Sequence, residues 1–171
     1  MKCIVLSDTH GHIETAKRAL RLNPDAEVVF FLGDGLEDIE FISNDCKNVA
    51  WICVRGNCDT YPYFKGEGVK SVESITLEGK RIVLTHGHLY GAKSGIGALT
   101  YLAREEGADI VLFGHTHTPC EIYISEFEKP FYLFNPGSAS GYDPGFGVIQ
   151  LKPGCEPLLS HGKACADKYE K

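Results

Sequence analysis

The segment DIVLFGHTHTP, residues 109–119, joins an apolar run to two histidines that stand one residue apart. Residues 109–114 read as a buried strand, because their apolar side chains are nearly continuous and a glycine ends the run. His115 and His117 follow that strand directly, before Pro119. A single pair of this kind is most often a polar turn, since histidine is frequently a satisfied polar residue. The pair becomes a candidate metal site only if other strands end in complementary ligands.

Four further apolar runs end in the same way, with oxygen or nitrogen donors and in most cases a nearby glycine. The donors are Asp8 and His10 after residues 3–7, Asp34 after 27–33, Asn57, Cys58 and Asp59 after 49–56, and His86 and His88 after 81–85. Binding sites in open α/β sheets form beyond the carboxyl ends of the strands, so all five sets are expected to meet. Asp8 with His10, and His115 with His117, are each expected to share a face, because extended backbone places residues i and i+2 on one side.

Strand-like and helix-like segments alternate in the first part of the chain, and strands cluster in the second part. Glu78-Gly79 indicates a hairpin turn, and the three last strands are expected to form a β-meander. The expected helices are 12–22, 36–42 and 94–107, and the last strands are 121–125, 130–135 and 146–151. This order predicts an α/β layered fold, with a mixed sheet or a two-sheet sandwich, in one domain over residues 1–171. The polar C-terminal segment from His161 onward is expected to fray.

The composition is that of an ordinary globular protein, with 43% hydrophobic and 23% charged residues. A formal net charge of −6 without a lysine or arginine cluster argues against an extended nucleic-acid surface. No apolar run approaches the length that a membrane span or secretory signal needs. Seven cysteines without a Cys-x-x-Cys pair indicate reduced thiols and a cytoplasmic location. A homo-oligomer is compatible with all of this.

The chemistry of the expected donors favours divalent metal ions. Nitrogen and oxygen ligands without thiolate suit manganese, iron, zinc, cobalt or nickel, of which manganese is the expected metal. Seven donors exceed the number that one tetrahedral site holds. They suit two ions that share a short, rigid carboxylate, and Asp34 between two glycines is the natural bridge.

These blocks resemble the signature of the calcineurin-like metallophosphoesterase superfamily, in its small single-domain bacterial and archaeal branch. The matching segments are SDTHG (7–11), GDGLED (33–38), GNCD (56–59), THGH (85–88), GHTHTP (114–119) and NPGS (135–138). They keep the family order, although GDGLED has one extra residue before its second acid. The resemblance implies a β-sandwich of two mixed sheets flanked by helices.

The resemblance also implies how the donors are divided between two metals. The ligands would be Asp8, His10, His117 and Asp34 for the first ion, and Asp34, Asn57, His86 and His115 for the second. Two ions held in this way can activate a bridging water or hydroxide for in-line attack on phosphorus. No side-chain nucleophile is then required.

One position departs from the family pattern. Cys58 stands where the usual signature has a histidine that contacts phosphate or protonates the leaving group. Because a thiol is a poorer proton donor in this role, small phosphodiesters are the expected substrates, with cyclic nucleotides among the candidates. His88 is the alternative source of an imidazole. Asp34, Cys58, Asp59 and His88 are therefore the candidate catalytic residues, with Asp59 orienting a neighbour by hydrogen bonding.

Other functions compete with this hypothesis, and several further residues have expected roles of their own. A phosphomonoesterase would use the same metal centre. A non-catalytic scaffold of the same fold, like a eukaryotic trafficking-complex subunit in this branch, would not need the complete donor set. A β-lactamase-like metallohydrolase is disfavoured, because HTHTPC lacks the Asp-His that should follow. Asp38 is expected on a solvated acidic face, Arg55 in an ion pair, Asn135 and Ser138 in support of the site, and His161 outside it.

Overall fold

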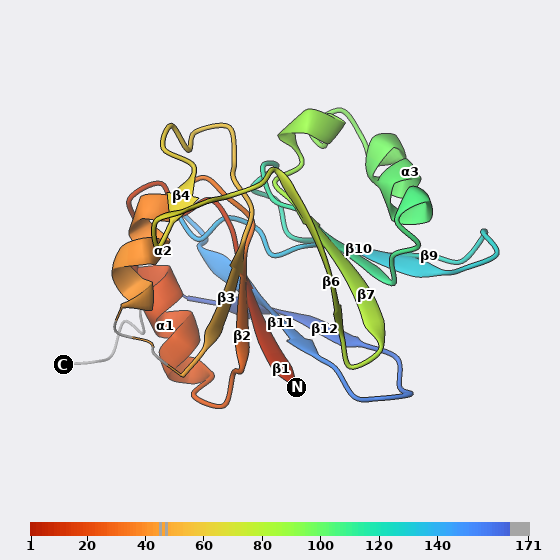
Figure 1. The fold of residues 1–171 in the computed structure, drawn as a ribbon, viewed down its shortest axis with the longest axis horizontal. Helices are drawn as coiled ribbons and strands as arrows, with labels where there is room; N and C mark the ends of the chain where they lie inside the picture. Colours follow the sequence, from red (N-terminus) through yellow and green to blue (C-terminus); the bar gives the residue numbers. More distant parts are fainter. Residues whose placement is uncertain (45, 47, 165–171) are drawn as a thin grey trace.

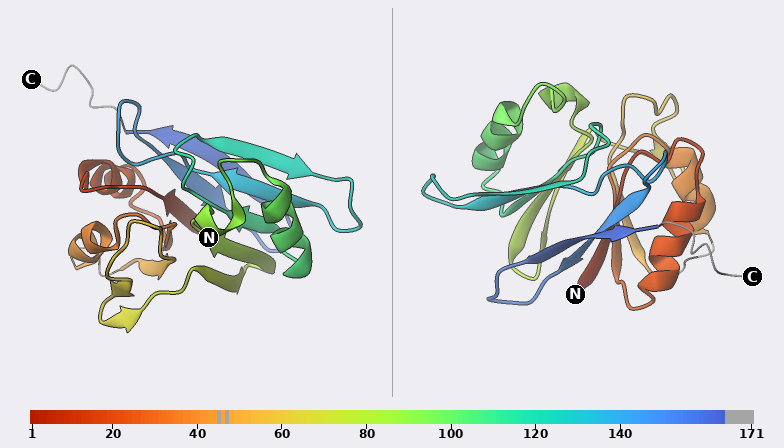
Figure 2. Two further views of the ribbon diagram at one scale, coloured as in Figure 1. Left: turned by 90° about the horizontal axis from the view of Figure 1, so that it is seen from above. Right: turned by 180° about the vertical axis from the view of Figure 1, so that it is seen from behind.

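A computed structural model describes residues 1–44, 46 and 48–164 of the chain. Two five-stranded sheets pack face to face, and helices cover the outer face of each sheet (Figure 1). The two views of Figure 2 keep α3 on the opposite side of the sandwich from α1 and α2. The expected sandwich of two mixed sheets with flanking helices is therefore confirmed.

The first sheet has the strand order β12-β11-β1-β2-β3. The three strands β1, β2 and β3 run parallel to one another, whereas β11 and β12 are antiparallel to their neighbours. The strands are β1 (Lys2–Leu6), β2 (Val28–Phe31), β3 (Ala50–Cys53), β11 (Gly145–Gln150) and β12 (Leu158–Lys163), and the covering helices are α1 (Glu14–Leu22) and α2 (Leu36–Ser43).

The second sheet has the order β6-β7-β8-β10-β9, with β7, β8 and β10 parallel. The strands are β6 (Val72–Leu77), β7 (Lys80–Thr85), β8 (Ile110–Leu112), β9 (Cys120–Ile124) and β10 (Phe131–Asn135), and the covering helix is α3 (Gly97–Glu105). A short two-stranded ribbon, β4 (Tyr63–Phe64) with β5 (Glu67–Gly68), and the 3₁₀ turn η1 (His88–Tyr90) lie in the connections.

Three apolar layers hold the sandwich together. The inner layer lies between the sheets, and two outer layers join each sheet to its helices. Successive residues of one strand serve different layers: Val5 of β1 belongs to the inner layer, and Ile4 and Leu6 belong to the layer under α1 and α2. Strands buried on both faces have continuous apolar sequences, and this is why the central strands were visible as unbroken runs.

The structure corrects the prediction for the last part of the chain. Strands β9 and β10 do pair antiparallel, but β11 crosses to the first sheet and pairs with β1, so the three do not form a meander. The segment from His161 was expected to fray, yet residues 161–163 belong to β12, an edge strand paired with β11. The polar edge strand was missed because one of its faces meets solvent. Residues 165–171 lie outside the described part of the chain.

The expected hairpin is present in the second sheet. Glu78 and Gly79 link β6 to β7, with φ of 50° and 79°. Two positive φ values in a two-residue loop are typical of the turn that matches the natural twist of paired strands. Among the described residues, none of the helices is long and apolar enough to cross a bilayer.

Candidate metal centre

All seven expected metal donors lie together at the carboxyl ends of five strands. Asp8 and His10 follow β1, Asp34 follows β2, Asn57 follows β3, His86 follows β7, and His115 and His117 follow β8. Each donor has an atom within 4.0 Å of an atom of another donor. The first three strands belong to one sheet and the last two to the other, so the donors meet where the two sheets join at one end of the sandwich.

The backbone that carries these donors is not extended, contrary to the expectation for the two i, i+2 pairs. Asp8, His10, Asp34, His115 and His117 all have φ between 45° and 66°. Left-handed backbone is uncommon for residues other than glycine, and where it persists it clusters at functional sites. In the pair His115 and His117 the two rings therefore reach different neighbours. The His115 ring lies beside His86, and the His117 ring lies beside Asp8.

One oxygen of the Asp8 carboxylate accepts hydrogen bonds, and the other has no hydrogen-bond donor among the described residues. Its Oδ2 accepts hydrogen bonds from Ser7 Oγ at 2.5 Å and from the His115 N–H at 3.1 Å. Its Oδ1 is buried and has no hydrogen-bond partner among the described residues, with His117 Nε2 at 3.1 Å and His10 Nε2 at 3.8 Å. A buried carboxylate oxygen without a donor is costly unless a cation binds it. The residues present therefore fit a metal ion here.

His86 is completely buried, and its ring orientation is fixed from behind. Its Nδ1 donates a hydrogen bond to the Leu32 carbonyl at 2.8 Å, which leaves Nε2 to face the centre. Around Nε2 lie Asn57 Oδ1 at 3.1 Å, His115 Nδ1 at 3.2 Å and Asp34 Oδ2 at 3.4 Å. A ring nitrogen held this way is a ready metal ligand.

The electrostatics of the centre favour positive charge. Burial acts to raise the pKa of Asp34, but hydrogen bonding with His86 and with the Cys58 N–H outweighs it and holds the pKa well below its ordinary value. Burial acts to lower the pKa of His86, but Asp34 and Asp8 together raise it above its ordinary value. Burial, and next the charge on His86, lower the pKa of His115. A divalent cation would supply the charge that a single proton on His86 otherwise provides.

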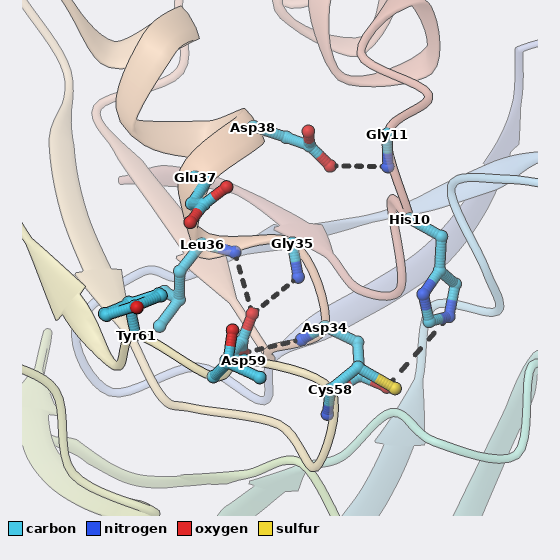
Figure 3. A pocket seen from close by; sticks show the side chains of 11 residues that line it. His10, Gly11, Asp34, Gly35, Leu36, Glu37, Asp38, Cys58, Asp59 and Tyr61 are labelled. Atoms are coloured by element: carbon cyan, nitrogen blue, oxygen red, sulfur yellow. Dashed lines mark hydrogen bonds and ion pairs between the residues drawn. The ribbon is translucent and has the colours of Figure 1, made fainter.

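Asp59 holds two of the ligand loops together, as the sequence suggested for it. Its Oδ2 accepts hydrogen bonds from the N–H groups of Asp34 at 2.9 Å and Gly56 at 2.7 Å. Its Oδ1 accepts from Gly35 at 2.8 Å and Leu36 at 3.0 Å. Figure 3 shows Asp59 beneath the start of α2, turned toward the backbone and away from the donors. The loop after β2 and the loop after β3 thus share one anchor.

Asp38 was expected on a solvated face, and that expectation is wrong. One oxygen of its carboxylate accepts hydrogen bonds from Thr9 Oγ1 at 2.6 Å and from the Gly11 N–H at 2.8 Å. Because Thr9 and Gly11 flank His10, Asp38 positions the loop that carries this donor. A carboxylate on α2 thus reaches the loop after β1.

Residues of the NPGS segment support the loops after β1 and β8, and His161 contacts the NPGS segment. Asn135 Nδ2 donates to the Gly114 carbonyl at 2.9 Å and to Thr116 Oγ1 at 3.0 Å, and Ser138 Oγ donates to the Asp8 carbonyl at 3.0 Å. His161, expected outside the site, stacks on Phe134, and its Nε2 lies 2.8 Å from the Asn135 carbonyl. Two supporting residues, Ser7 and Ser140, were not predicted from the sequence. Ser7 Oγ donates to the Asp8 carboxylate, and Ser140 Oγ donates to the Asp8 carbonyl at 2.9 Å.

Cys58 lies at the open side of the centre. Its N–H donates to Asp34 Oδ1 at 2.7 Å, and its sulfur, a nitrogen of His10 and an oxygen of Asp34 all lie within 4.8 Å of one another. Partial burial and the Asp34 carboxylate raise the pKa of the Cys58 thiol, so the thiol stays protonated at neutral pH. Figure 3 shows the sulfur turned toward the His10 ring.

His88 lies beside His86 and His115, with ring centroids 5.3 and 6.1 Å away. Its Nδ1 is buried and has no hydrogen-bond partner within the part of the chain that the structure describes. Burial and the charge on His86 lower its pKa, so its ring is neutral at pH 7. Arg55, expected in an ion pair, donates instead to Ser71 Oγ at 2.9 Å.

Comparisons with known proteins agree with this geometry. The sequence model described as the calcineurin-like phosphoesterase superfamily domain matches residues 1–152. The chain is 33% identical over 138 residues to the probable metallophosphoesterase YsnB of Bacillus subtilis, covering 81% of this chain and 75% of that protein. It is 29% identical over 176 residues to phosphodiesterase YfcE of Escherichia coli, covering 87% of each. Vps29 of Entamoeba histolytica, solved with Zn²⁺, has a TM-score of 0.71 at 21% identity, over 95% of this chain and 99% of that chain.

Proposed function

This chain belongs to the calcineurin-like phosphoesterase superfamily, and from that premise we propose that it is a phosphodiesterase with a centre of two divalent cations that acts on small substrates by in-line attack of water. The observation that carries the proposal is the buried Asp8 Oδ1, which has no hydrogen-bond donor among the described residues and is surrounded by imidazole nitrogens. YfcE, a relative over most of the chain, is named a phosphodiesterase.

Seven side chains would hold the cations, of which manganese is the proposed metal. The ligands would be Asp8, His10, His117 and Asp34 for one ion, and Asp34, Asn57, His86 and His115 for the other. When bound, two such cations lower the pKa of a water molecule toward neutrality and stabilise charge on the phosphoryl oxygens. Asp34 suits the shared position because its Oδ2 lies near both groups, 4.0 Å from His10 Nε2 and 3.4 Å from His86 Nε2.

The remaining residues hold the proposed ligands in place or lie where they can contact the substrate. The Cys58 N–H fixes Asp34 through its Oδ1, and the Leu32 carbonyl fixes the ring of His86. His88, whose lowered pKa keeps it neutral, places an uncharged ring beside the second group of ligands. There its N–H can donate one hydrogen bond to a phosphoryl oxygen or to a departing alkoxide.

The preference for diesters comes from Cys58. A thiol with a raised pKa gives up its proton less readily than an imidazolium would, so a poor alkoxide leaving group gains little help from it. A phosphate monoester depends on such help more than a diester with a good leaving group. A phosphomonoesterase at the same centre is the alternative that an assay of both substrates decides.

A binding module of the same fold is the other alternative, and the fold that the chain shares with Vps29 allows it. Because that Vps29 was solved with zinc, metal binding alone does not separate an enzyme from a binding module. Turnover does separate them. The metal-dependent rate on a diester is therefore the deciding measurement.

We would test the proposal on protein stripped with a chelator and reloaded with Mn²⁺. The substrates are bis(4-nitrophenyl) phosphate and 4-nitrophenyl phosphate, and released nitrophenol is measured. We expect turnover only with metal, and a higher kcat/KM for the diester. Asp34→Asn should lower both the bound metal and the rate by roughly 100-fold or more, whereas Asp25→Asn, an exposed control that pairs with Lys2, should change neither.

Three results would contradict the proposal in different ways. A higher kcat/KM for the monoester would overturn the diester preference. Metal binding without turnover of either ester would favour the binding module. An Asp34→Asn protein that keeps its metal and its rate would mean that Asp34 is not the shared ligand.

A further inference from the structure

A cavity of about 300 Å³ opens directly beside the metal centre, on the side of Cys58. One end, next to the centre, is lined by His10, Asp34 and Cys58, and the other end by Leu36, Glu37 and Tyr61. Figure 3 shows these two ends facing each other across the opening. This volume is at the lower end of the range for small-molecule sites. A diester whose phosphate meets the centre would place one of its two ester groups in this cavity.

Glu37 differs from the other carboxylates around the cavity. Asp59 is engaged by backbone N–H groups, Asp38 by Thr9 and Gly11, and Asp34 by the Cys58 N–H. The Glu37 side chain is exposed and forms no hydrogen bond or ion pair with any residue that the structure describes. Its carboxylate lies between Asp38 and the ring of Tyr61 (Figure 3). It is therefore the acid left available to a ligand.

Tyr61 supplies an aromatic surface next to that carboxylate. The residue is 70% exposed although it is a large aromatic side chain. Neither lysine nor arginine lines the cavity within the described ranges, and its one imidazole, His10, belongs to the metal centre. An anionic ester group would meet repulsion from Glu37 without a compensating cation. A cationic group would meet a carboxylate and a ring face, the pair of features that attracts quaternary ammonium ions.

We infer that Glu37 and Tyr61 make this cavity select diesters in which one ester group carries a positive charge, as an amino alcohol such as choline does. The inference rests on the proposed phosphodiesterase activity and specifies its substrate class. Glu37 supplies the negative charge and Tyr61 supplies the ring face. The ester bond that breaks is the one with the better leaving group, whether or not that group lies in the cavity.

The test compares two substrates that share a leaving group and a shape. They are 4-nitrophenyl phosphocholine and 3,3-dimethylbutyl 4-nitrophenyl phosphate, in which a carbon replaces the positively charged nitrogen. On the Mn²⁺-loaded full-length protein we expect kcat/KM to be roughly tenfold higher for the choline ester, the size of an exposed cation–π contact together with an exposed ion pair.

Variants assign the preference to the two residues. Glu37→Gln and Tyr61→Ala should each reduce the ratio of the two kcat/KM values by about threefold. Tyr61→Phe should keep the ratio, because the ring remains. Glu105→Gln removes one exposed negative charge on α3, away from the cavity, and should also keep the ratio, which separates a local effect from the net charge of the protein.

Equal kcat/KM values for the two esters would overturn this inference alone, and so would a ratio that Glu37→Gln leaves intact. The unsubstituted diester bis(4-nitrophenyl) phosphate serves as the reference. Loss of turnover on all three esters would overturn the proposed function and the inference with it.

Discussion

At the scale of single residues, Asp59 shows how a side chain without a metal-facing atom can determine the site. Its two oxygens accept four backbone hydrogen bonds, from residues 34–36 in one loop and from Gly56 in another. Asp34 and Asn57, two of the proposed ligands, sit on those same loops. The distance between the loops therefore depends on one carboxylate.

We predict that Asp59→Ala weakens both the fold and the metal centre. Removal of the acceptor leaves N–H groups without partners in a half-buried place, which costs about 2 kcal/mol of the free energy of unfolding. Loss of a residue that orients ligands should weaken Mn²⁺ binding about 10- to 100-fold. Urea unfolding of the metal-free protein and calorimetric titration with Mn²⁺ measure the two effects. Asp59→Asn, which keeps one oxygen, should fall between; an alanine variant with unchanged metal affinity would contradict the anchoring role.

The meeting of the proposed ligands could be predicted from sequence, and the residues that support them mostly could not. His86 and His115 were visible because each directly follows an apolar run that must be a strand. Asp38 and His161 were not, since their partners stand 26 or more residues away, at Thr9, Gly11 and Asn135. Nothing in the local pattern around Asp38 separates an anchoring carboxylate from a solvated one.

At the scale of elements, the loops that follow β2 and β3 can lie close together only because each has a glycine at the point of contact. A Cβ added to Gly56 would lie 2.0 Å from Asp34 Oδ1 and 2.6 Å from the Asp34 nitrogen. A Cβ added to Gly33 would lie 2.3 Å from the Gly56 nitrogen. The backbones of the two loops are thus too close to leave room for a side chain at either glycine. Gly33 and Gly56, two of the glycines noticed beside the donors in the sequence, have this physical reason.

We predict that Gly56→Ala displaces Asp34 and abolishes tight metal binding while the protein still folds. The clash is with Asp34 itself, so the loop must move by more than its ligands tolerate. Metal content after reloading, measured by mass spectrometry, and circular dichroism check the two parts. Gly68→Ala in β5 is the matched control, because an added Cβ there meets nothing within 4 Å and no unusual φ is required. Equal metal content in both variants would contradict the steric argument.

The positions of the strands were predicted more reliably than the strands with which each one pairs. Continuous apolar runs identify β1, β2, β7 and β8, because strands covered on both faces need such residues. The pairing of β11 with β1 joins residues almost 150 positions apart, such as Lys2 with Gln150. Local patterns carry no information on that choice, so the expected meander was the natural error.

At the scale of the whole molecule, the proposed centre spans both sheets of the sandwich. Asp8, His10, Asp34 and Asn57 come from loops of the first sheet, and His86, His115 and His117 from loops of the second. Each proposed ion takes ligands from both. The sheets otherwise meet through the apolar inner layer, so bound metal would add a polar link at one end of that layer.

We predict that metal raises the thermal stability of the entire chain. A ligand that binds only the folded state at 100 times its Kd stabilises it by about 2.7 kcal/mol, which for a chain of this size raises Tm by roughly 5–10 °C. Calorimetry of the chelated protein with and without Mn²⁺ measures the shift. The transition should move as one, because the ligands lie on both sheets. A shift confined to part of a split transition would contradict the link between sheets, and a full shift in Asp34→Asn would show that the stabilising metal binds elsewhere.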